Sequence, residues 1–109
     1  MEFKPRLFEQ FSRIAKAMSS GNRLQLLELV AQGERSVENL ANLTGMSVAN
    51  TSRHLQQLRL AGLVRSRKDG LYVHYQIAGG GVVRLLHALG EVAEHNLAEV
   101  SQLITEFLT

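Results

Sequence analysis

The spacing of apolar residues changes near Gly62, and this change limits the folds that the chain can adopt. Before Gly62, apolar residues recur at helical intervals; after it, they alternate with polar residues through Leu63–Arg67 and Leu71–Ile77, as expected for half-buried strands. Lys68-Asp69-Gly70 separates the two runs, and its Asp-Gly pair predicts a hairpin turn because both residue types tolerate positive φ. The chain is therefore predicted to be mainly α with a β-hairpin.

Four helices are predicted before the hairpin and one after it, giving the order α-α-α-α-β-β-α. Ser36 and Ser47 are favourable N-caps, and Gly45 and Gly62 are favourable C-terminal stops. Gly79-Gly80-Gly81 is interpreted as a hinge or a helix-start loop before the last helix. The predicted helical segments are residues 7–18, 24–30, 37–43, 48–61 and 82–108.

The length and composition exclude several kinds of protein. At 109 residues the chain is long enough for one domain, predicted to span residues 1–109, and the absence of cysteine excludes disulfides, thiolate metal sites and cysteine nucleophiles. Since no apolar run reaches about 18 residues and the N-terminus is unlike a secretory signal, we expect a cytoplasmic protein without a membrane partner.

Charge is distributed unevenly along the chain. Residues 47–78 carry five basic side chains and one acidic one, whereas residues 79–109 carry one basic side chain and four acidic ones. This asymmetry favours a basic segment that faces a polyanion and an acidic segment that is turned away from it, although a basic segment of this size is often only a solvated face.

The two short helices joined at Thr44-Gly45-Met46-Ser47 predict a helix-turn-helix, whose second helix is the size of one that enters the DNA major groove. Val48, Thr51, Ser52, Leu55 and Leu58 fall on one side of that helix, and the other side is polar. An arginine there can bind guanine, and Asn or Gln can bind adenine. The candidate DNA-binding residues of this helix are Ser47, Ala49, Asn50, Ser52, Arg53, His54, Gln56 and Gln57.

The hairpin is basic and follows the helix-turn-helix directly. Arg65, Arg67, Lys68 and His74 are its candidate DNA contacts, either along the phosphate backbone or in the minor groove. The alternative is a cationic edge hairpin that resists aggregation. The order and proximity of the two elements favour DNA binding.

Three segments carry a resemblance to a known family. These are Asn22-Arg23-Leu24-Gln25-Leu26-Leu27, Ser52-Arg53-His54-Leu55 followed by Leu58-Arg59-Leu60-Ala61-Gly62-Leu63-Val64, and Gly70-Leu71-Tyr72-Val73-His74-Tyr75. The chain resembles the ArsR/SmtB family of repressors over nearly its whole length. This resemblance implies transcription regulation by a winged helix-turn-helix homodimer, paired through its first and last helices, that binds double-stranded DNA at an inverted-repeat operator until a signal releases it.

The sensing sites of that family do not transfer to this chain. The third predicted helix lacks the cysteines of members that bind soft metals. In the last helix, the positions that would carry the family's other zinc ligands, counted from His87, are Leu85, Ala98 and Ser101, which do not bind zinc. Four residues of the last helix share one face and are weak candidates for a metal site: His87, Glu91, Glu94 and His95. A solvated helix face with ordinary i,i+4 pairs is the preferred interpretation of these residues, so no metal and no cofactor are expected.

Several alternatives stay open. The apolar stripe of the last helix is either core or, as we prefer, a seam between two subunits. The sequence shows no phosphate loop and no Ser-His-Asp set, so an enzyme is not expected. The chain also resembles the cysteine-free N-terminal part of repressors fused to a rhodanese (sulfurtransferase) domain, which itself is not found before Thr109. A metal-responsive repressor and a protein-interaction module are the remaining alternatives.

Overall fold

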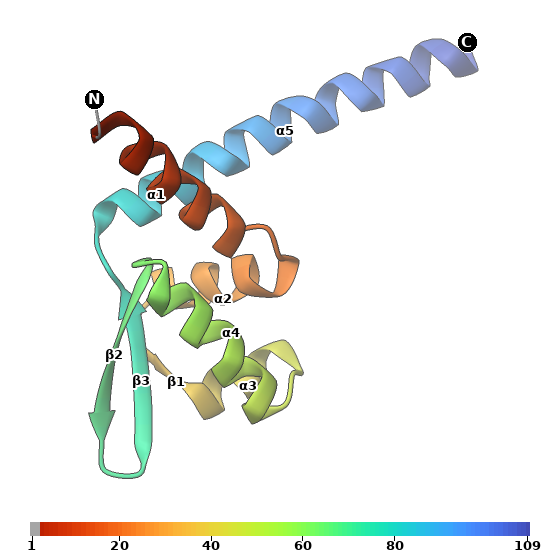
Figure 1. Ribbon diagram of the computed structural model, residues 1–109. Coiled ribbons are helices and arrows are strands. Elements are labelled where there is room, and N and C mark those ends of the chain that lie inside the picture. The colour runs from red at the N-terminus through yellow and green to blue at the C-terminus, as the bar shows by residue number, and fades with distance from the viewer. Residues whose placement is uncertain (1–2) are drawn as a thin grey trace. The chain divides into compact units, whose positions relative to one another are not determined.

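The computed structural model describes residues 3–109, which form two compact units divided between Gly79 and Gly80 (Figure 1). The second unit is a single helix, α5 (Gly80–Leu108). The first unit contains α1 (Phe3–Ala17), α2 (Gly21–Ala31), β1 (Arg35–Ser36), α3 (Val37–Thr44), α4 (Val48–Leu60), β2 (Val64–Asp69) and β3 (Tyr72–Ile77).

Serine side chains start three of the helices. Ser20, Ser36 and Ser47 each accept a hydrogen bond at Oγ from the backbone N–H three residues later, at 3.3, 3.1 and 3.1 Å. These bonds satisfy donors that the first turn of a helix leaves free. The predicted caps at Ser36 and Ser47 are confirmed. Helix α2 begins at Gly21, three residues before its predicted start, and α5 begins at Gly80, inside the segment interpreted as a hinge or a helix-start loop.

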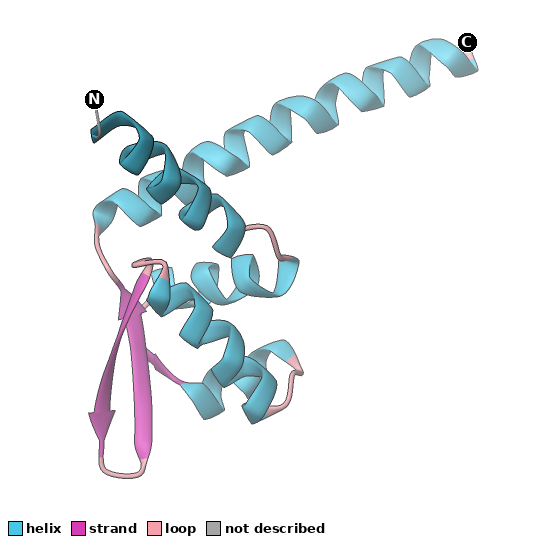
Figure 2. Ribbon diagram, in the orientation of Figure 1, coloured by secondary structure: helices cyan, strands magenta, loops and turns pink. Residues whose placement is uncertain are grey.

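The sheet has three antiparallel strands in the order β1-β3-β2, where two were predicted (Figure 2). β1 is only Arg35–Ser36, paired with Tyr75 and His74 of β3. Two residues are too few to show an alternating pattern, so the sequence could not reveal this strand. The observed order is therefore α-α-β-α-α-β-β-α.

The hairpin turn lies one residue later than predicted. Asp69 pairs with Tyr72, so Gly70 and Leu71 form a two-residue loop. Gly70 has φ +61°, and within residues 3–109 no residue other than glycine has positive φ. Asp69 does not use the positive φ that its residue type tolerates, since a glycine at the first central position is sufficient for a type II′ connection.

The core of the first unit is formed by leucines of α2, α3 and α4 together with Tyr75 of β3, which is 1% exposed. On α4, Thr51, Leu55 and Leu58 are completely buried. The Thr51 hydroxyl donates to the Ser47 carbonyl at 2.8 Å, so its burial leaves no unpaired polar group. The predicted inner side of this helix is confirmed for these three residues, whereas Val48 is 50% exposed.

Helix α5 spans 29 residues and buries none of them fully. Its exposed large apolar residues include Leu85, Leu89, Val92, Leu97, Val100, Leu103, Ile104 and Phe107. Across the described residues, no helix combines the length and apolar character that crossing a membrane requires.

Replacing Leu55 by alanine should lower the free energy of unfolding by about 2–5 kcal/mol, because truncating a buried leucine loses apolar contacts and leaves a cavity. The matched control is Leu60→Ala on the same helix, whose side chain is 75% exposed and should change stability by no more than about 0.5 kcal/mol. Urea denaturation at one protein concentration measures both values. Equal losses for the two variants would contradict the assignment of the inner side of α4.

Candidate nucleic-acid interface

The outward side of α4 presents polar side chains that are joined in pairs. Arg53 Nη2 donates to Asn50 Oδ1, and Arg59 donates to Gln56 Oε1 from Nε at 3.1 Å and from Nη2 at 2.9 Å. Each pair spans three residues, a spacing that places side chains on one helical face. The pairs hold two guanidinium groups next to amide groups on the exposed side. Arg59 was not among the predicted contacts, although its spacing from Gln56 could have indicated it.

The other predicted residues of α4 differ in exposure. Ser47, Ala49, Arg53, Gln56 and Gln57 are exposed, whereas Asn50, Ser52 and His54 are half-buried. All eight belong to the N-cap and the first three turns of α4. The first backbone N–H groups of a helix have no hydrogen-bond acceptor within the helix. This end of α4 therefore also offers N–H donors to an anion.

His54 packs against Arg23 of α2. Arg23 Nη1 lies 3.4 Å from His54 Nδ1, while its Nε and Nη2 donate to the carbonyls of Ala17 and Lys16 at the end of α1. Burial, followed by the charges of Arg23 and Arg53, lowers the pKa of His54 below its usual value of 6.5. The imidazole is therefore neutral at pH 7 and accepts from Arg23 at Nδ1. The imidazole contacts α2 through Arg23, which itself reaches the end of α1, and it does not supply a cation.

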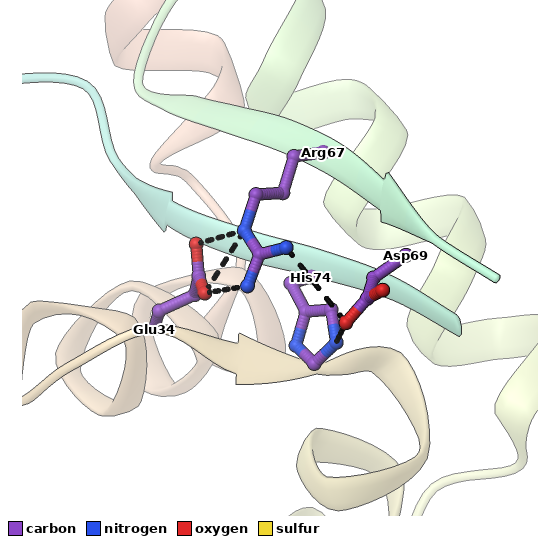
Figure 3. Close-up of polar contacts among 4 residues, drawn as sticks. All are labelled: Glu34, Arg67, Asp69 and His74. Carbon is purple, nitrogen blue, oxygen red and sulfur yellow. Dashed lines mark hydrogen bonds and ion pairs between the residues drawn. The ribbon is translucent and has the colours of Figure 1, made fainter.

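In the hairpin, the side chain of Arg67 reaches from β2 across β3 to Glu34 (Figure 3). Its Nη2 lies 2.7 Å from Glu34 Oε1, and its Nε donates to both carboxylate oxygens at 3.2 and 3.0 Å. This hydrogen-bonded ion pair lowers the pKa of Glu34 and raises that of Arg67. Asp69 Oδ2 lies 3.9 Å from both Arg67 Nη1 and His74 Nε2. Arg67 therefore links β2 to the loop before β1.

The remaining hairpin cations have different partners. Arg65 Nη2 donates to the Ala78 carbonyl at 2.7 Å. Lys68 is exposed, and it takes part in no ion pair within residues 3–109. Among the predicted hairpin contacts, Lys68 is thus the cation most available to a phosphate, while Arg67 is already neutralised by Glu34.

The weak metal candidates lie on α5. Within the part of the chain that the structure describes, no three His, Asp or Glu side chains converge on a point where a metal ion could be held. His95 Nε2 instead lies 3.2 Å from Glu99 Oε1, one turn further along the helix.

Two short helices joined by a tight turn, with a polar outward face on the second and a basic hairpin after it, define a winged helix-turn-helix domain. The family model for "Bacterial regulatory protein, arsR family" matches residues 20–66, from the cap of α2 into β2. The uncharacterized HTH-type transcriptional regulator Rv0081 of Mycobacterium tuberculosis is 33% identical over 91% of this chain and 87% of its own length. The chain belongs to the arsR family of bacterial regulatory proteins.

Two further relatives show the extent of the similarity. The regulator Rv0324 of M. tuberculosis is 45% identical over 90% of this chain, but the chain spans only 43% of that relative's length. The solved homodimeric winged helix-turn-helix DNA-binding domain of Mb0332 from Mycobacterium bovis is also 45% identical, with a TM-score of 0.81 over 86% of this chain and 87% of that one. The predicted family and fold are confirmed.

The stability of the protein should fall as the pH is lowered from 7 to 5, in part through His54. Its pKa is lowered in the folded state, so below pH 6.5 the unfolded chain binds the proton first. This contribution is fully present above 6.5 and is lost as the pH falls towards the folded-state value. His54→Asn, which keeps an acceptor near Arg23, should weaken the pH dependence of thermal unfolding, whereas the exposed control His87→Asn should leave it intact. If both variants keep the parent's pH dependence, the neutral His54–Arg23 contact is wrong.

Proposed function

We propose that the protein is a dimeric transcriptional repressor that binds an inverted-repeat DNA operator through α4 and the β2–β3 hairpin. The observation that carries the proposal is the division of α4 into a buried side and an exposed side. Thr51, Leu55 and Leu58 anchor the helix in the core, and the opposite side presents Arg53 and Gln56 to solvent. A helix exposed in this way can enter a major groove and form hydrogen bonds with base edges.

In this proposal the two DNA-contacting elements have separate roles. Arg53 binds the O6 and N7 atoms of guanine, and Asn50, Gln56 and Gln57 provide amide groups for adenine. Ser47, Ala49 and Ser52 lie near the start of α4, where the backbone amides bind a phosphate. Lys68 and Arg65 contact the DNA backbone. Arg67 and His74 hold the hairpin in place, and His54 connects α4 to α2.

Dimerisation is proposed from α5 and from the relatives. An amphipathic helix that buries none of its residues fully and exposes eight or more large apolar side chains is typical of a subunit interface. The Mb0332 domain, 45% identical, is homodimeric. A two-fold axis would place two copies of α4 about 34 Å apart, one turn of B-DNA, which accounts for an inverted repeat as the target.

Arg53→Ala should weaken binding to the preferred duplex by about 1–3 kcal/mol and relax the preference at one base position per half-site, because a bidentate guanine contact is lost. The duplex is the inverted repeat enriched by the parent protein from a random library, and affinities are measured by fluorescence anisotropy. Arg84→Ala on α5 is the charge-matched control. If the parent enriches no inverted repeat, the repressor proposal fails and a protein-interaction role becomes the better explanation.

Lys68→Ala and Arg67→Ala should differ in their effect on the salt dependence of DNA binding. Loss of a free phosphate-binding cation should reduce the slope of log affinity against log salt by about one, equally for all sequences. Since Glu34 already neutralises Arg67, Arg67→Ala should weaken binding with a smaller change in slope. Titrations at several salt concentrations test this, and equal changes in slope for the two variants would contradict the assigned roles.

A further inference from the structure

A groove of about 330 Å³ lies on the first unit, where the last turns of α1 and α4 meet the start of α2. It is open to solvent on one side. Three of its lining residues are cations and none is acidic; the others are two alanines, a leucine and a glutamine. The lining comprises Arg13, Lys16, Ala17, Arg23, Gln57, Leu60 and Ala61.

The positive charge of this groove is not neutralised by the protein. Within the described residues, Arg13, Lys16 and Arg23 form no ion pair with a carboxylate. Arg23 donates only to uncharged groups, namely the carbonyls of Lys16 and Ala17 and Nδ1 of His54. Cations commonly offset the partial negative charge at the end of a helix, which explains Lys16 and Arg23. Arg13 lies one turn before the end of α1 and is not explained in this way.

The lining combines this charge with an apolar surface. Ala17, Ala61 and the 75% exposed side chain of Leu60 provide the apolar part, beside the three cations. A small-molecule site typically combines apolar surface with polar groups that fix the orientation of the ligand, and it has a volume from about 300 Å³ upwards. An anion with a short apolar body satisfies both parts of the lining.

We propose that this groove binds a small organic anion, whose carboxylate or phosphate group is held by Arg13, Lys16 and Arg23 and whose apolar body lies against Leu60 and Ala61. The ligand is not the DNA backbone. Along α4, at 1.5 Å per residue, Leu60 lies about 15 Å from Asn50, so the groove opens beside the last turn of the helix, away from the base contacts proposed for its first turns. Gln57 is the one proposed base contact that also lines the groove.

Occupation of the groove would also act on α4, and this step rests on the proposed function. Arg23 contacts the end of α1 and His54 of α4 at the same time. An anion that bridges Arg13 and Lys16 of α1 to Arg23 would bind the same guanidinium group that contacts His54. The site would therefore couple a small anion to the position of the DNA-binding helix.

Binding to the full chain without DNA tests the site itself. Sodium benzoate, phenyl phosphate and inorganic phosphate are titrated while the NMR signal of the Arg23 Nε–H is followed, with sodium chloride added to constant ionic strength. Benzoate or phenyl phosphate should give a saturable shift, and inorganic phosphate should bind at least threefold more weakly because it lacks an apolar body. Which aromatic probe binds more tightly identifies the anionic group. Equal binding of inorganic phosphate would overturn the apolar part of the proposal.

Two double variants of α1 test the lining, and each of them removes two positive charges. Arg13→Gln/Lys16→Gln should weaken probe binding at least tenfold, whereas Lys4→Gln/Arg6→Gln, outside the groove on α1, should leave it unchanged within twofold. All four side chains are exposed, so folding is expected to persist and is checked by circular dichroism. No saturable shift up to 10 mM probe, or equal losses in both double variants, would overturn the site.

The regulatory step has a separate readout. At saturating probe, the affinity of the parent for its inverted-repeat duplex should change at least threefold, and that of Arg13→Gln/Lys16→Gln should not change. An unchanged affinity of the parent would overturn the coupling to α4. A protein that binds the probe but enriches no DNA sequence would contradict the proposed function and leave the anion site standing.

Discussion

The burial of one side of α4 is the constraint on which the rest of the structure depends. Leu55 and Leu58 are removed from water completely, and so is Thr51, whose hydroxyl is satisfied by the Ser47 carbonyl. Fully burying a leucine contributes on the order of 1.5–3 kcal/mol, so this helix cannot rotate about its axis without a large loss of stability. The orientation of Arg53 and of the amide side chains follows from that burial and does not depend on their own interactions.

Basic residues of the domain differ in whether a carboxylate of the protein already neutralises them. Arg67 and Lys68 are adjacent in sequence, yet Arg67 is bound to Glu34 across the sheet and Lys68 is free of ion pairs in the described residues. Arg23 differs from Arg67, because it contacts only uncharged groups at the end of α1 and on His54 and keeps its positive charge. Net charge alone therefore overstates the number of cations that a DNA phosphate can recruit, and the side-chain partners decide which of them are available.

The two units of the chain bury apolar surface in different ways. The first unit has its own core, and its exposed residues are largely polar along α4 and the hairpin. Helix α5 has a continuous apolar stripe but no fully buried residue. Such a stripe is unfavourable in water, which agrees with the homodimeric state of the Mb0332 domain and with the dimer proposed for this chain.

The sequence by itself determined the helices, their caps at Ser36 and Ser47, the inner side of α4 and the existence of the hairpin. These features depend on local hydrogen bonds and on the period of the apolar residues, both of which are set by residues close together in the sequence. The tertiary structure decided the third strand, the turn at Gly70-Leu71, and the partners of Arg67, Arg23 and His54. Those contacts join residues about thirty positions apart or depend on strand register, and neither periodicity nor residue type specifies which distant group a charged side chain will meet.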